Sequence, residues 1–419
     1  MGSWSDSGPA SRFSSLQPAP LDGVFALDAA YRKDAHEPKV NLGIGAYRDD
    51  EGQPWQLGAV KKARSKMAAD VWLHEYLPLH GDDAFLEASK KLLFGPKIPA
   101  TAIASVQTVS GTGANSVVAR LAGQYLAPSQ VWFPDPTWDN HYKIWEDNAP
   151  NARQRRYPYF DASSRRFDLE GMLTTLRRDA LAGDAILLHA CAHNPTGLDP
   201  TQEQWKQIAQ VCLEKKLFVI FDVAYQGFAS GDLDRDAWAV RYFCSFPELE
   251  LAACQSFSKN LGLYGERAGA LHVVPSRATA DPVVVMGVRS TLVDIQRGTI
   301  SMAPRFGSQV ASMVMGSDEL LKLWKEDLLR MSRRIIGMRQ ALYEELLRLG
   351  TPGDWRHIVE QCGMFSFTGL SPEQVETMQK DYHVYMLPSG RMSVCGLTST
   401  NVHYVAASMD ATVRRGLSA

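Results

Sequence analysis

The strongest constraint on the fold is an alternation of short apolar runs with helical patterns, which fills the chain from about residue 100 to residue 275. The runs are apolar almost throughout rather than at every second position, as in strands that are buried on both faces. They lie at Ala104–Val109, Gln130–Phe133, Ala185–His189, Leu217–Phe221, Leu249–Gln255 and Ala270–Val274. This pattern predicts an α/β fold in which a mostly parallel sheet carries helices on both faces.

A second region follows toward the C-terminus. A helical pattern covers residues 318–349, and a mixed tail comes after it, with short strands expected near residues 364–368, 384–386 and 391–394. The tail predicts a second, smaller α/β domain.

Composition excludes several classes of partner. The 44 Lys and Arg residues nearly balance 46 Asp and Glu residues, and the formal charge of −2 provides no basic field for nucleic acid or anionic lipid. No apolar stretch approaches the roughly 20 residues that span a bilayer, so we expect no membrane contact. The six cysteines form no C-x-x-C pair, which is typical of reduced thiols in an intracellular enzyme.

The first 20 residues are rich in Ser, Pro and Gly and contain no apolar segment of a secretory signal. We therefore expect a cytoplasmic protein. A mitochondrial transit peptide is the alternative, and it is disfavoured because the segment holds only one Arg, Arg12, together with Asp6.

Ligands of open parallel sheets bind beyond the carboxyl ends of the strands. The first such end carries Ser110-Gly111-Thr112-Gly113-Ala114-Asn115, before a helix that we expect to start near Asn115. Small residues and hydroxyls at a helix start suit a phosphate, although simple helix capping is the alternative. The segment matches neither G-x-G-x-x-G nor the Walker A motif, which lowers the odds of an NAD or ATP site.

Two further strand ends carry polar residues. His189 and His193 are four residues apart, but that spacing ligates a metal only from a helix, and Asn194-Pro195 breaks one here. We expect no metal and expect Asn194 to face the cleft. Asp222 comes directly after a buried strand and needs a partner there, unless it caps the next helix, and Tyr225 is either a site residue or a packed phenol.

The fourth strand end carries Lys259, between an apolar run and a turn. Most lysines lie on the surface, but this one sits among Ser256 and Ser258, and Arg267 follows eight residues later. An arginine fork of this kind suits a phosphate dianion.

Together these segments resemble the fold-type I, class I pyridoxal-phosphate-dependent aminotransferases, in particular the aspartate aminotransferase family. The likeness extends from Leu21 to about the C-terminus. The matching motifs are VNLGIGAYR (40–48), HEYLP (74–78), SGTGAN (110–115), PTWDNH (136–141), HACAHNPTG (189–197), FDVAYQGF (221–228), DRDAWAVR (234–241), SFSKNLGLYGER (256–267) and SGRMSVCGL (389–397).

The resemblance implies roles around a pyridoxal 5′-phosphate cofactor. It makes Lys259 the Schiff-base lysine that also moves a proton, and Asp222 the partner of the ring nitrogen, supported by His141 and His189. Asn194 and Tyr225 would hydrogen-bond the phenolate oxygen and Trp138 would stack on the ring. The phosphate would be bound by Ser110, Gly111, Thr112, Ser256, Ser258 and Arg267, with Tyr76 supplied by a second subunit.

The resemblance also implies a substrate site and a homodimer. Arg391 would bind the α-carboxylate and Arg297 of the neighbouring subunit the distal carboxylate, with Gly45, Trp138, Asn194, Ser301 and Phe365 beside them. From the residues alone, Arg297 would be a surface residue at a helix end. The implied domains are a large cofactor domain at 53–325 and a small domain of 21–52 with 326–419, after an N-terminal arm at 1–20.

The implied reaction is a ping-pong exchange of L-aspartate and 2-oxoglutarate for oxaloacetate and L-glutamate. Ser301-Met302-Ala303-Pro304 departs from the commoner Ser-Asn-Pro-Pro, and Gly265 from Asn, so a broad-specificity or aromatic aminotransferase is the alternative. Another reaction of the same cofactor, a silent binding protein and an NAD-dependent oxidoreductase are weaker candidates.

Overall fold

A seven-stranded sheet forms the centre of the molecule. The computed structural model describes residues 11–19, 22–69, 74–278 and 281–418, so most of the expected N-terminal arm lies outside the described residues. The strand order is β2-β10-β9-β8-β7-β3-β4. The strands are β2 (Ala104–Val109), β3 (Gln130–Asp135), β4 (Arg153–Pro158), β7 (Ala185–His189), β8 (Phe218–Val223), β9 (Leu251–Ser256) and β10 (Ala268–Val274).

The prediction of a mostly parallel α/β sheet is confirmed. The pairs β4-β3, β3-β7, β7-β8 and β8-β9 are parallel, while β10 is antiparallel to both β9 and β2. All six expected strands are present, with ends shifted by up to two residues.

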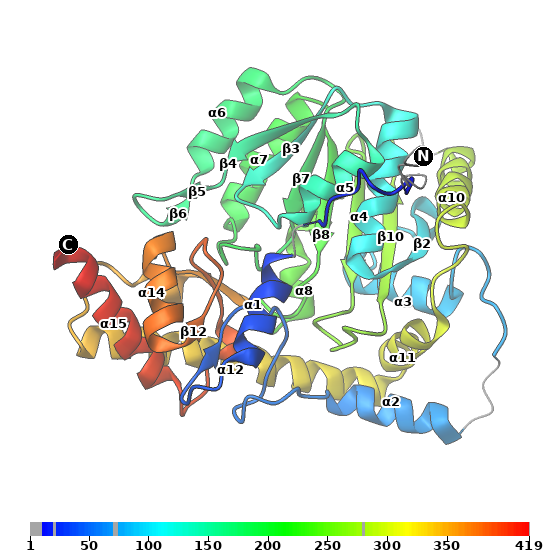
Figure 1. Ribbon diagram of the computed structural model, residues 1–419. Coiled ribbons are helices and arrows are strands. Elements are labelled where there is room, and N and C mark those ends of the chain that lie inside the picture. The colour runs from blue at the N-terminus through cyan, green and yellow to red at the C-terminus, as the bar shows by residue number, and fades with distance from the viewer. Residues whose placement is uncertain (1–10, 20–21, 70–73, 279–280, 419) are drawn as a thin grey trace, which may run out of the picture.

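Helices cover both faces of the sheet (Figure 1). On one face, Ile186 of β7 and Phe221 of β8 pack in a core with α6 (Leu169–Asp179), α7 (Gln202–Glu214) and α9 (Trp238–Phe243). On the other, Leu187 and Ile220 pack in a core with α4 (Ser110–Leu121), α5 (Asn140–Asn148) and α10 (Pro282–Arg297). Because neighbouring residues of one strand point to opposite faces, the continuous apolar runs follow from this double cover.

The C-terminal region packs below the sheet around the long helix α12 (Asp318–Arg348) (Figure 1). Short strands β11 (Phe365–Phe367) and β13 (Arg391–Ser393) pair antiparallel, and β1 (Val40–Asn41) pairs in parallel with β12 (Val384–Tyr385). An early segment of the chain therefore lies beside a late one. The domain boundaries at residues 52 and 326 stay a prediction.

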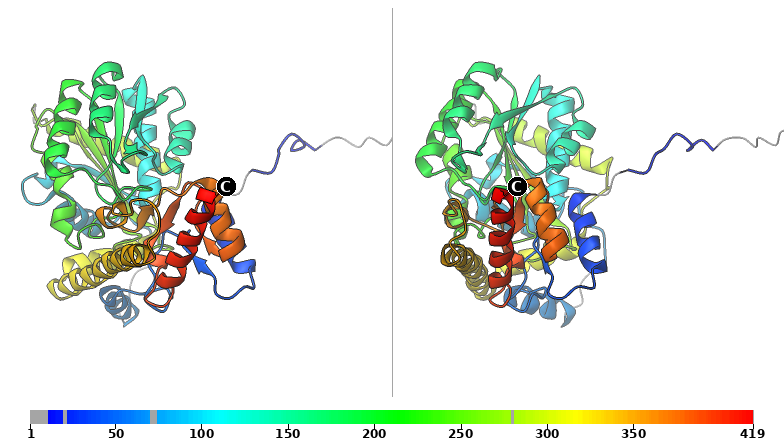
Figure 2. Two further views of the ribbon diagram at one scale, coloured as in Figure 1. Left: turned by 90° about the vertical axis from the view of Figure 1, so that its left-hand side faces the viewer. Right: turned by 60° about the vertical axis from the view of Figure 1, so that its left-hand side comes forward.

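The remaining elements are α1 (Gly23–Lys33), α2 (Gly58–Ala69), α3 (Asp83–Phe94), η1 (Ala100–Ala102), η2 (Ala122–Leu126), β5 (Phe160–Asp161), β6 (Arg166–Phe167), α8 (Leu233–Asp236), α11 (Arg305–Gly316), α13 (His357–Glu360), α14 (Pro372–Tyr382), η3 (Val394–Gly396) and α15 (Val402–Ser418). Residues 11–19 are exposed throughout and run away from the body (Figure 2). Within the described residues, no helix combines the length and apolar character needed to cross a membrane.

Two sequence expectations about boundaries are wrong. Helix α4 starts at Ser110 rather than near Asn115, so Ser110 to Asn115 form its first turns instead of a loop before it. Strand β8 continues to Val223, because Asp222 still pairs with His189 of β7 and Cys254 of β9. Asp222 is therefore held inside the sheet and does not cap a following helix.

Candidate active site

A cavity of about 700 Å³ opens at the carboxyl ends of the parallel strands. Its volume lies in the range of small-molecule sites. Fifteen of the predicted site residues line it: Gly45, Ser110, Gly111, Thr112, Trp138, His189, Asn194, Asp222, Tyr225, Ser256, Ser258, Lys259, Arg267, Phe365 and Arg391. The structure thus brings together residues that are more than 300 positions apart in the sequence, from Gly45 to Arg391.

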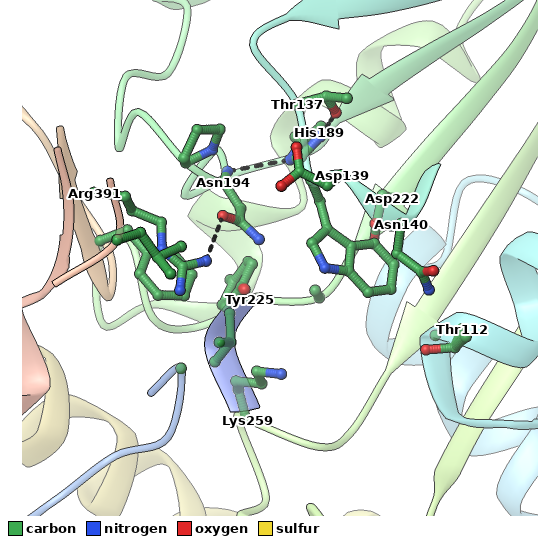
Figure 3. Close-up of a pocket in the computed structure, with 18 of the residues that line it drawn as sticks. Thr112, Thr137, Asp139, Asn140, His189, Asn194, Asp222, Tyr225, Lys259 and Arg391 are labelled. Carbon is green, nitrogen blue, oxygen red and sulfur yellow. Dashed lines mark hydrogen bonds between the residues drawn. The ribbon is translucent and has the colours of Figure 1, made fainter. Parts of the chain in front are cut away.

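Lys259 lies on the turn after β9, beside Tyr225 in the cavity (Figure 3). Its Nζ atom is 5.8 Å from the ring centroids of both Tyr225 and Tyr264. Burial, helped by the charges of Arg267 and Arg391, lowers the pKa of Lys259 to about 8. A fraction of this amine is therefore neutral near pH 7, and a neutral amine is a nucleophile and a base.

A directional chain of hydrogen bonds supports Asp222. The Asn194 N–H donates to Nδ1 of His189 at 3.3 Å, and burial lowers the pKa of His189 to about 3, so the ring is neutral. Its Nε2–H therefore donates to the hydroxyl of Thr137 at 3.1 Å, and Thr137 donates to Nδ1 of His141 at 2.9 Å. The Nε2–H of His141 is left to donate to Oδ2 of Asp222 at 2.9 Å.

This chain fixes the role of each histidine. His141 contacts Asp222 directly but does not line the cavity, whereas the hydrogen bonds from His189 reach Asp222 through Thr137 and His141. Thr137 lies within the quoted motif PTWDNH, but the sequence analysis gave it no role because a buried threonine carries no signal of its own.

The second oxygen of Asp222 has no partner. Oδ1 is buried and accepts no hydrogen bond within the described chain. Burial raises the pKa of Asp222, but the hydrogen bond from His141 and the charges nearby lower it, and the net pKa lies below the ordinary value. An ionised carboxylate with a free, buried oxygen is suited to a cationic N–H donor from a ligand.

One end of the cavity is lined by hydroxyls. The Oγ atom of Ser110 lies 2.9 Å from that of Ser256 and 2.7 Å from that of Ser258, and Arg267 Nη1 donates to Ser258 Oγ at 3.4 Å. Ser110 and Arg267 both have left-handed backbones, with φ of 59° and 55°, and the Ser110 N–H donates to the Arg267 carbonyl. Strain of this kind is typical of functional sites.

Gly269 allows the start of α4 to lie this close to β10. A Cβ atom at Gly269 would lie 2.6 Å from the backbone of Ser110, so no other residue could occupy this position of β10 without moving the start of α4. The hydroxyl cluster and Arg267 together form a cradle suited to a phosphate.

Arg391 lies at the opposite end of the cavity, where it is buried (Figure 3). Its guanidinium donates to Asn194 Oδ1 at 3.4 Å and to the Gly43 carbonyl at 2.8 Å, and it stacks 4.3 Å from the ring centroid of Phe365. Its Nε atom is buried and has no partner among the described residues. The fork is therefore positioned, with capacity left for a carboxylate.

Gly45 borders this end, because a Cβ atom there would lie 2.9 Å from the Phe365 ring. Trp138 also lines the cavity and packs edge-on against His141, with centroids 5.1 Å apart.

Four predicted site residues do not line the cavity of their own chain: His141, which contacts Asp222 from behind it, and Tyr76, Arg297 and Ser301. Tyr76 is 86% exposed, and its carbonyl accepts a hydrogen bond from Arg305 at 3.2 Å. Arg297 is exposed at the end of α10 and donates to the hydroxyl of Ser301, which has a φ of 67°. A single chain therefore leaves the expected roles of Tyr76, Arg297 and Ser301 unfilled.

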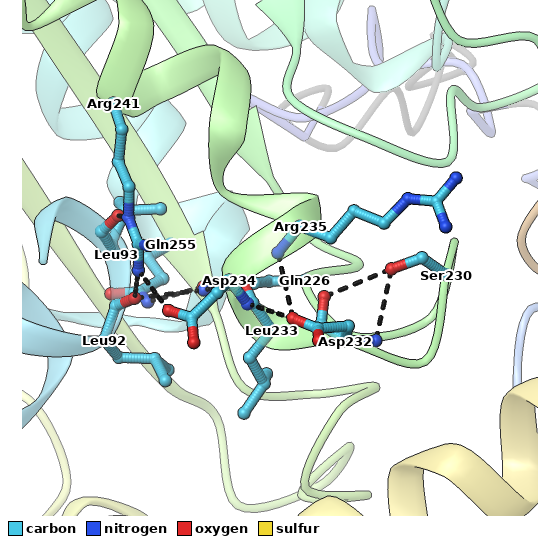
Figure 4. A network of polar contacts seen from close by, with 10 residues as sticks. All are labelled: Leu92, Leu93, Gln226, Ser230, Asp232, Leu233, Asp234, Arg235, Arg241 and Gln255. Atoms are coloured by element: carbon cyan, nitrogen blue, oxygen red, sulfur yellow. Dashed lines mark hydrogen bonds and ion pairs between the residues drawn. The ribbon is translucent and has the colours of Figure 1, made fainter.

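A polar network holds the segment after β8 (Figure 4). The Gln226 amide donates to the Leu92 carbonyl at 3.2 Å and the Leu233 carbonyl at 3.0 Å, and it accepts from Gln255 at 3.3 Å. The Gln226 carbonyl accepts from Asn260 at 3.2 Å. Because Gln226 follows Tyr225 and Asn260 follows Lys259, this bond ties the two cavity-lining turns together.

The fold and the cavity define an enzyme whose chemistry centres on a buried amine beside an ionised carboxylate. The family profile of aminotransferase class I and II matches residues 37–409, and the chain belongs to that family.

Its relatives carry two kinds of name. The chain is 48% identical to an L-tyrosine:2-oxoglutarate aminotransferase of Aspergillus ustus, over 93% of this chain and 76% of that protein. It is 45% identical to a cytoplasmic aspartate aminotransferase of Schizosaccharomyces pombe, over 96% of this chain and 98% of that protein. The solved aspartate aminotransferase from the cytoplasm of Saccharomyces cerevisiae superposes with a TM-score of 0.94 and 40% identity, covering 97% of this chain and 100% of that one.

Enzymes of this family use pyridoxal phosphate, and the residues present fit that group. The unpartnered Oδ1 of Asp222 suits a protonated ring nitrogen, the hydroxyl cluster with Arg267 suits the phosphate, and Lys259 suits the aldehyde.

Proposed function

We propose that the chain is an aspartate aminotransferase that converts L-aspartate and 2-oxoglutarate to oxaloacetate and L-glutamate in ping-pong order. The observation that carries the proposal is the shared cavity of Lys259, Asp222 and Arg391, in a chain that matches aspartate aminotransferases over nearly its whole length.

Each residue has a defined task in this proposal. Pyridoxal phosphate, when bound, supplies an electron sink that stabilises the carbanion formed when the substrate loses its Cα proton. Asp222, kept ionised by His141, holds the ring nitrogen in its protonated form. Lys259 accepts the Cα proton at Nζ and would then donate it to C4′ of the cofactor. A pKa of about 8 suits an amine that both accepts and donates a proton.

The remaining cavity residues bind and orient. Ser110, Ser256, Ser258 and Arg267, with the backbone of Gly111 and Thr112, hold the phosphate, while Trp138, Asn194 and Tyr225 hold the ring. Arg391 binds the α-carboxylate of the substrate with its free donor capacity. Closure of a small domain that carries Arg391 would exclude water from the cavity.

The site requires a second copy of the chain. Arg297 would reach the distal carboxylate, and Tyr76 the phosphate, only in the cavity of a partner subunit. Both residues are exposed in the single chain, and so are the apolar side chains of Val283, Val284 and Met286 in α10 and of Ile300 after it. Exposed apolar side chains along this helix favour a homodimer with shared sites.

An aromatic or broad-specificity aminotransferase is the second candidate. The cavity lining also includes the apolar residues Phe25, Phe367, Leu387 and Pro388, which could accommodate an aromatic side chain. The similarity to an L-tyrosine:2-oxoglutarate aminotransferase favours the same possibility.

A steady-state panel of amino donors against 2-oxoglutarate tests the proposal. Aspartate should yield oxaloacetate with the parallel-line kinetics of a ping-pong enzyme, and the absence of transfer from any donor would refute the assignment. If kcat/KM for aspartate exceeds that for tyrosine and phenylalanine by more than ~1,000-fold, over 4 kcal/mol, the aromatic candidate is rejected. We propose a cytoplasmic location from the names of the relatives, which fractionation of cells can test.

A further inference from the structure

The amine of Lys259 depends on the backbone for its position. Among the described residues its Nζ atom makes no hydrogen bond or ion pair, and the ring centroids of Tyr225 and Tyr264 lie 5.8 Å away. The turn that carries it, residues 257–262, therefore decides where the amine can reach. A misplacement of about 1 Å in a reacting group can lower a rate about 100-fold.

This turn is anchored in the core on both sides of Lys259. Phe257 and Leu261 are fully buried and belong to the same apolar cluster as Trp324 of α12. The Gly262 N–H donates to the Lys259 carbonyl at 3.0 Å and closes the turn. The backbone next to the amine is thus fixed by groups that lie behind the cavity.

Asn260 ties the turn to two other parts of the chain. Its side-chain amide donates to the Gln226 carbonyl at 3.2 Å, and its own carbonyl accepts from the indole N–H of Trp324 at 2.6 Å. Asn260 and Trp324 are both buried, so water cannot readily replace the indole as a donor. Trp324 itself does not line the cavity, and its contact with the site runs through the residue after Lys259.

The substrate end of the cavity has different supports. Arg391 is held by Asn194, by the Gly43 carbonyl and by the ring of Phe365. None of these bonds involves Trp324. A loosened turn at Lys259 should therefore slow proton transfer and leave the binding of carboxylates unchanged.

We propose that Trp324 is a positioning residue, whose indole N–H holds the turn 257–262 so that the amine of Lys259 meets the Cα proton of the substrate. This inference rests on the proposed aminotransferase function. Helix α12 acts in it as the fixed support of the turn, since the indole reaches the Asn260 carbonyl from the buried side of the helix.

The test compares Trp324→Phe with Trp355→Phe in the holoenzyme. Trp324→Phe keeps an aromatic ring in the core and removes the indole N–H. Trp355→Phe is the matched control, because Trp355 is also buried and its indole also donates to a backbone carbonyl, that of Pro352 at 3.2 Å. Neither Pro352 nor its chain neighbours line the cavity.

Three kinetic results are expected for Trp324→Phe. The kcat per cofactor-loaded site should fall by about 10- to 100-fold, while the control stays within about twofold. The isotope effect on kcat with α-deuterated aspartate should be at least as large as in the unmodified enzyme, because proton transfer is the step that slows. The inhibition constant of succinate, which has two carboxylates but no amine, should change by less than about twofold.

Hydrogen exchange gives a readout that does not depend on turnover. A peptide that contains the Gly262 N–H should exchange about five- to tenfold faster in Trp324→Phe, since the turn opens more often, and other peptides should match the control. Asn260→Ala removes the second tie of the turn and should give the same four results. It keeps the inference testable if Trp324→Phe does not fold.

Other outcomes overturn the inference. A fall in kcat of less than about twofold, or no greater than in the control, would show that Trp324 does not place Lys259. A smaller isotope effect would mean that another step has slowed, and a parallel rise in the inhibition constant of succinate would mean that α12 supports the whole site. Faster exchange throughout the chain would indicate lost global stability instead. If the unmodified holoenzyme transfers no amino group from aspartate, the proposed function itself fails, whatever the variants do.

Discussion

Replacing Asp222 by asparagine separates the charge of this carboxylate from its place in the hydrogen-bond chain. The amide oxygen of asparagine can still accept the proton of His141 Nε2, which lies 2.9 Å from Asp222 Oδ2. Thr137 and His189 therefore keep their partners, and the fold should be retained. The negative charge beside the unpartnered Oδ1 position is lost.

The expected loss can be worked out from the surroundings of Asp222. It is only 8% exposed, so little water can replace the lost charge. Removing one partner of a buried, hydrogen-bonded charge pair costs about 2–5 kcal/mol. At 1.4 kcal/mol per tenfold, kcat/KM should fall by between about 30-fold and a few thousandfold.

The assay is the initial rate of oxaloacetate formation from aspartate and 2-oxoglutarate, with cofactor loading checked by visible absorbance. Asp236→Asn is the control, because Asp236 is also a buried carboxylate but accepts hydrogen bonds from Gly227 and Ala229 outside the cavity. It should lose stability and keep its activity. A fully loaded Asp222→Asn enzyme that retains at least about a third of the original kcat/KM would refute the electrostatic role, since that loss is under 1 kcal/mol.

Three further predictions follow from the same geometry. Lys259→Ala should abolish turnover. In the unmodified protein without cofactor, Lys259 should react with amine reagents at pH values between about 8 and 10.5, where ordinary lysines are still protonated. Reaction no faster than that of surface lysines would contradict its lowered pKa. Mixing Lys259→Ala with Arg297→Ala subunits should restore about a quarter of the wild-type sites. Half of the dimers are then mixed, and one of the two sites in each mixed dimer has both Lys259 and Arg297. No recovery of activity would exclude shared sites. Thr137→Val should lower the free energy of unfolding, measured with denaturant, by ~2–5 kcal/mol, because His141 and His189 each lose a buried hydrogen-bond partner. Thr137→Ser keeps the hydroxyl and should not lower it. Equal losses in both variants would argue against the role of the hydroxyl.

The buried strands were predictable because a strand covered on both faces accepts only apolar or small residues. Strands β7 and β9 are covered on both faces, so every position is apolar or small apart from the polar residues at their carboxyl ends. Strand β4 was not predicted, because Arg153-Gln154-Arg155-Arg156 lies at the edge of the sheet with several exposed side chains and carries no apolar run. An edge strand with charged side chains is protected from pairing with other chains but carries little signal of its own.

The cavity was predictable where strand ends converge and less so where contacts cross the chain. Asp222 and Lys259 end or follow apolar runs, and Arg267 directly precedes the strand β10, which is antiparallel to its neighbours; the structure places all three in one cavity. The link from His189 to Asp222 through Thr137 could not be inferred, since it depends on the distance between two loops rather than on spacing in either one. Tyr76 and Arg297 are exposed on their own chain, so neither the spacing of the sequence nor burial marks them as site residues.

The walls of the cavity come from residues as distant in the sequence as Asp22 and Arg391. The residues that would hold pyridoxal phosphate are themselves as far apart as Ser110 and Arg267, so a chain whose central sheet is not yet assembled has no complete receptor for it, and the cofactor binds only folded protein. At 100 times its dissociation constant it would add about 2.7 kcal/mol to the free energy of unfolding. In a cell that degrades unfolded chains, the supply of this cofactor would then set the amount of enzyme as well as its activity.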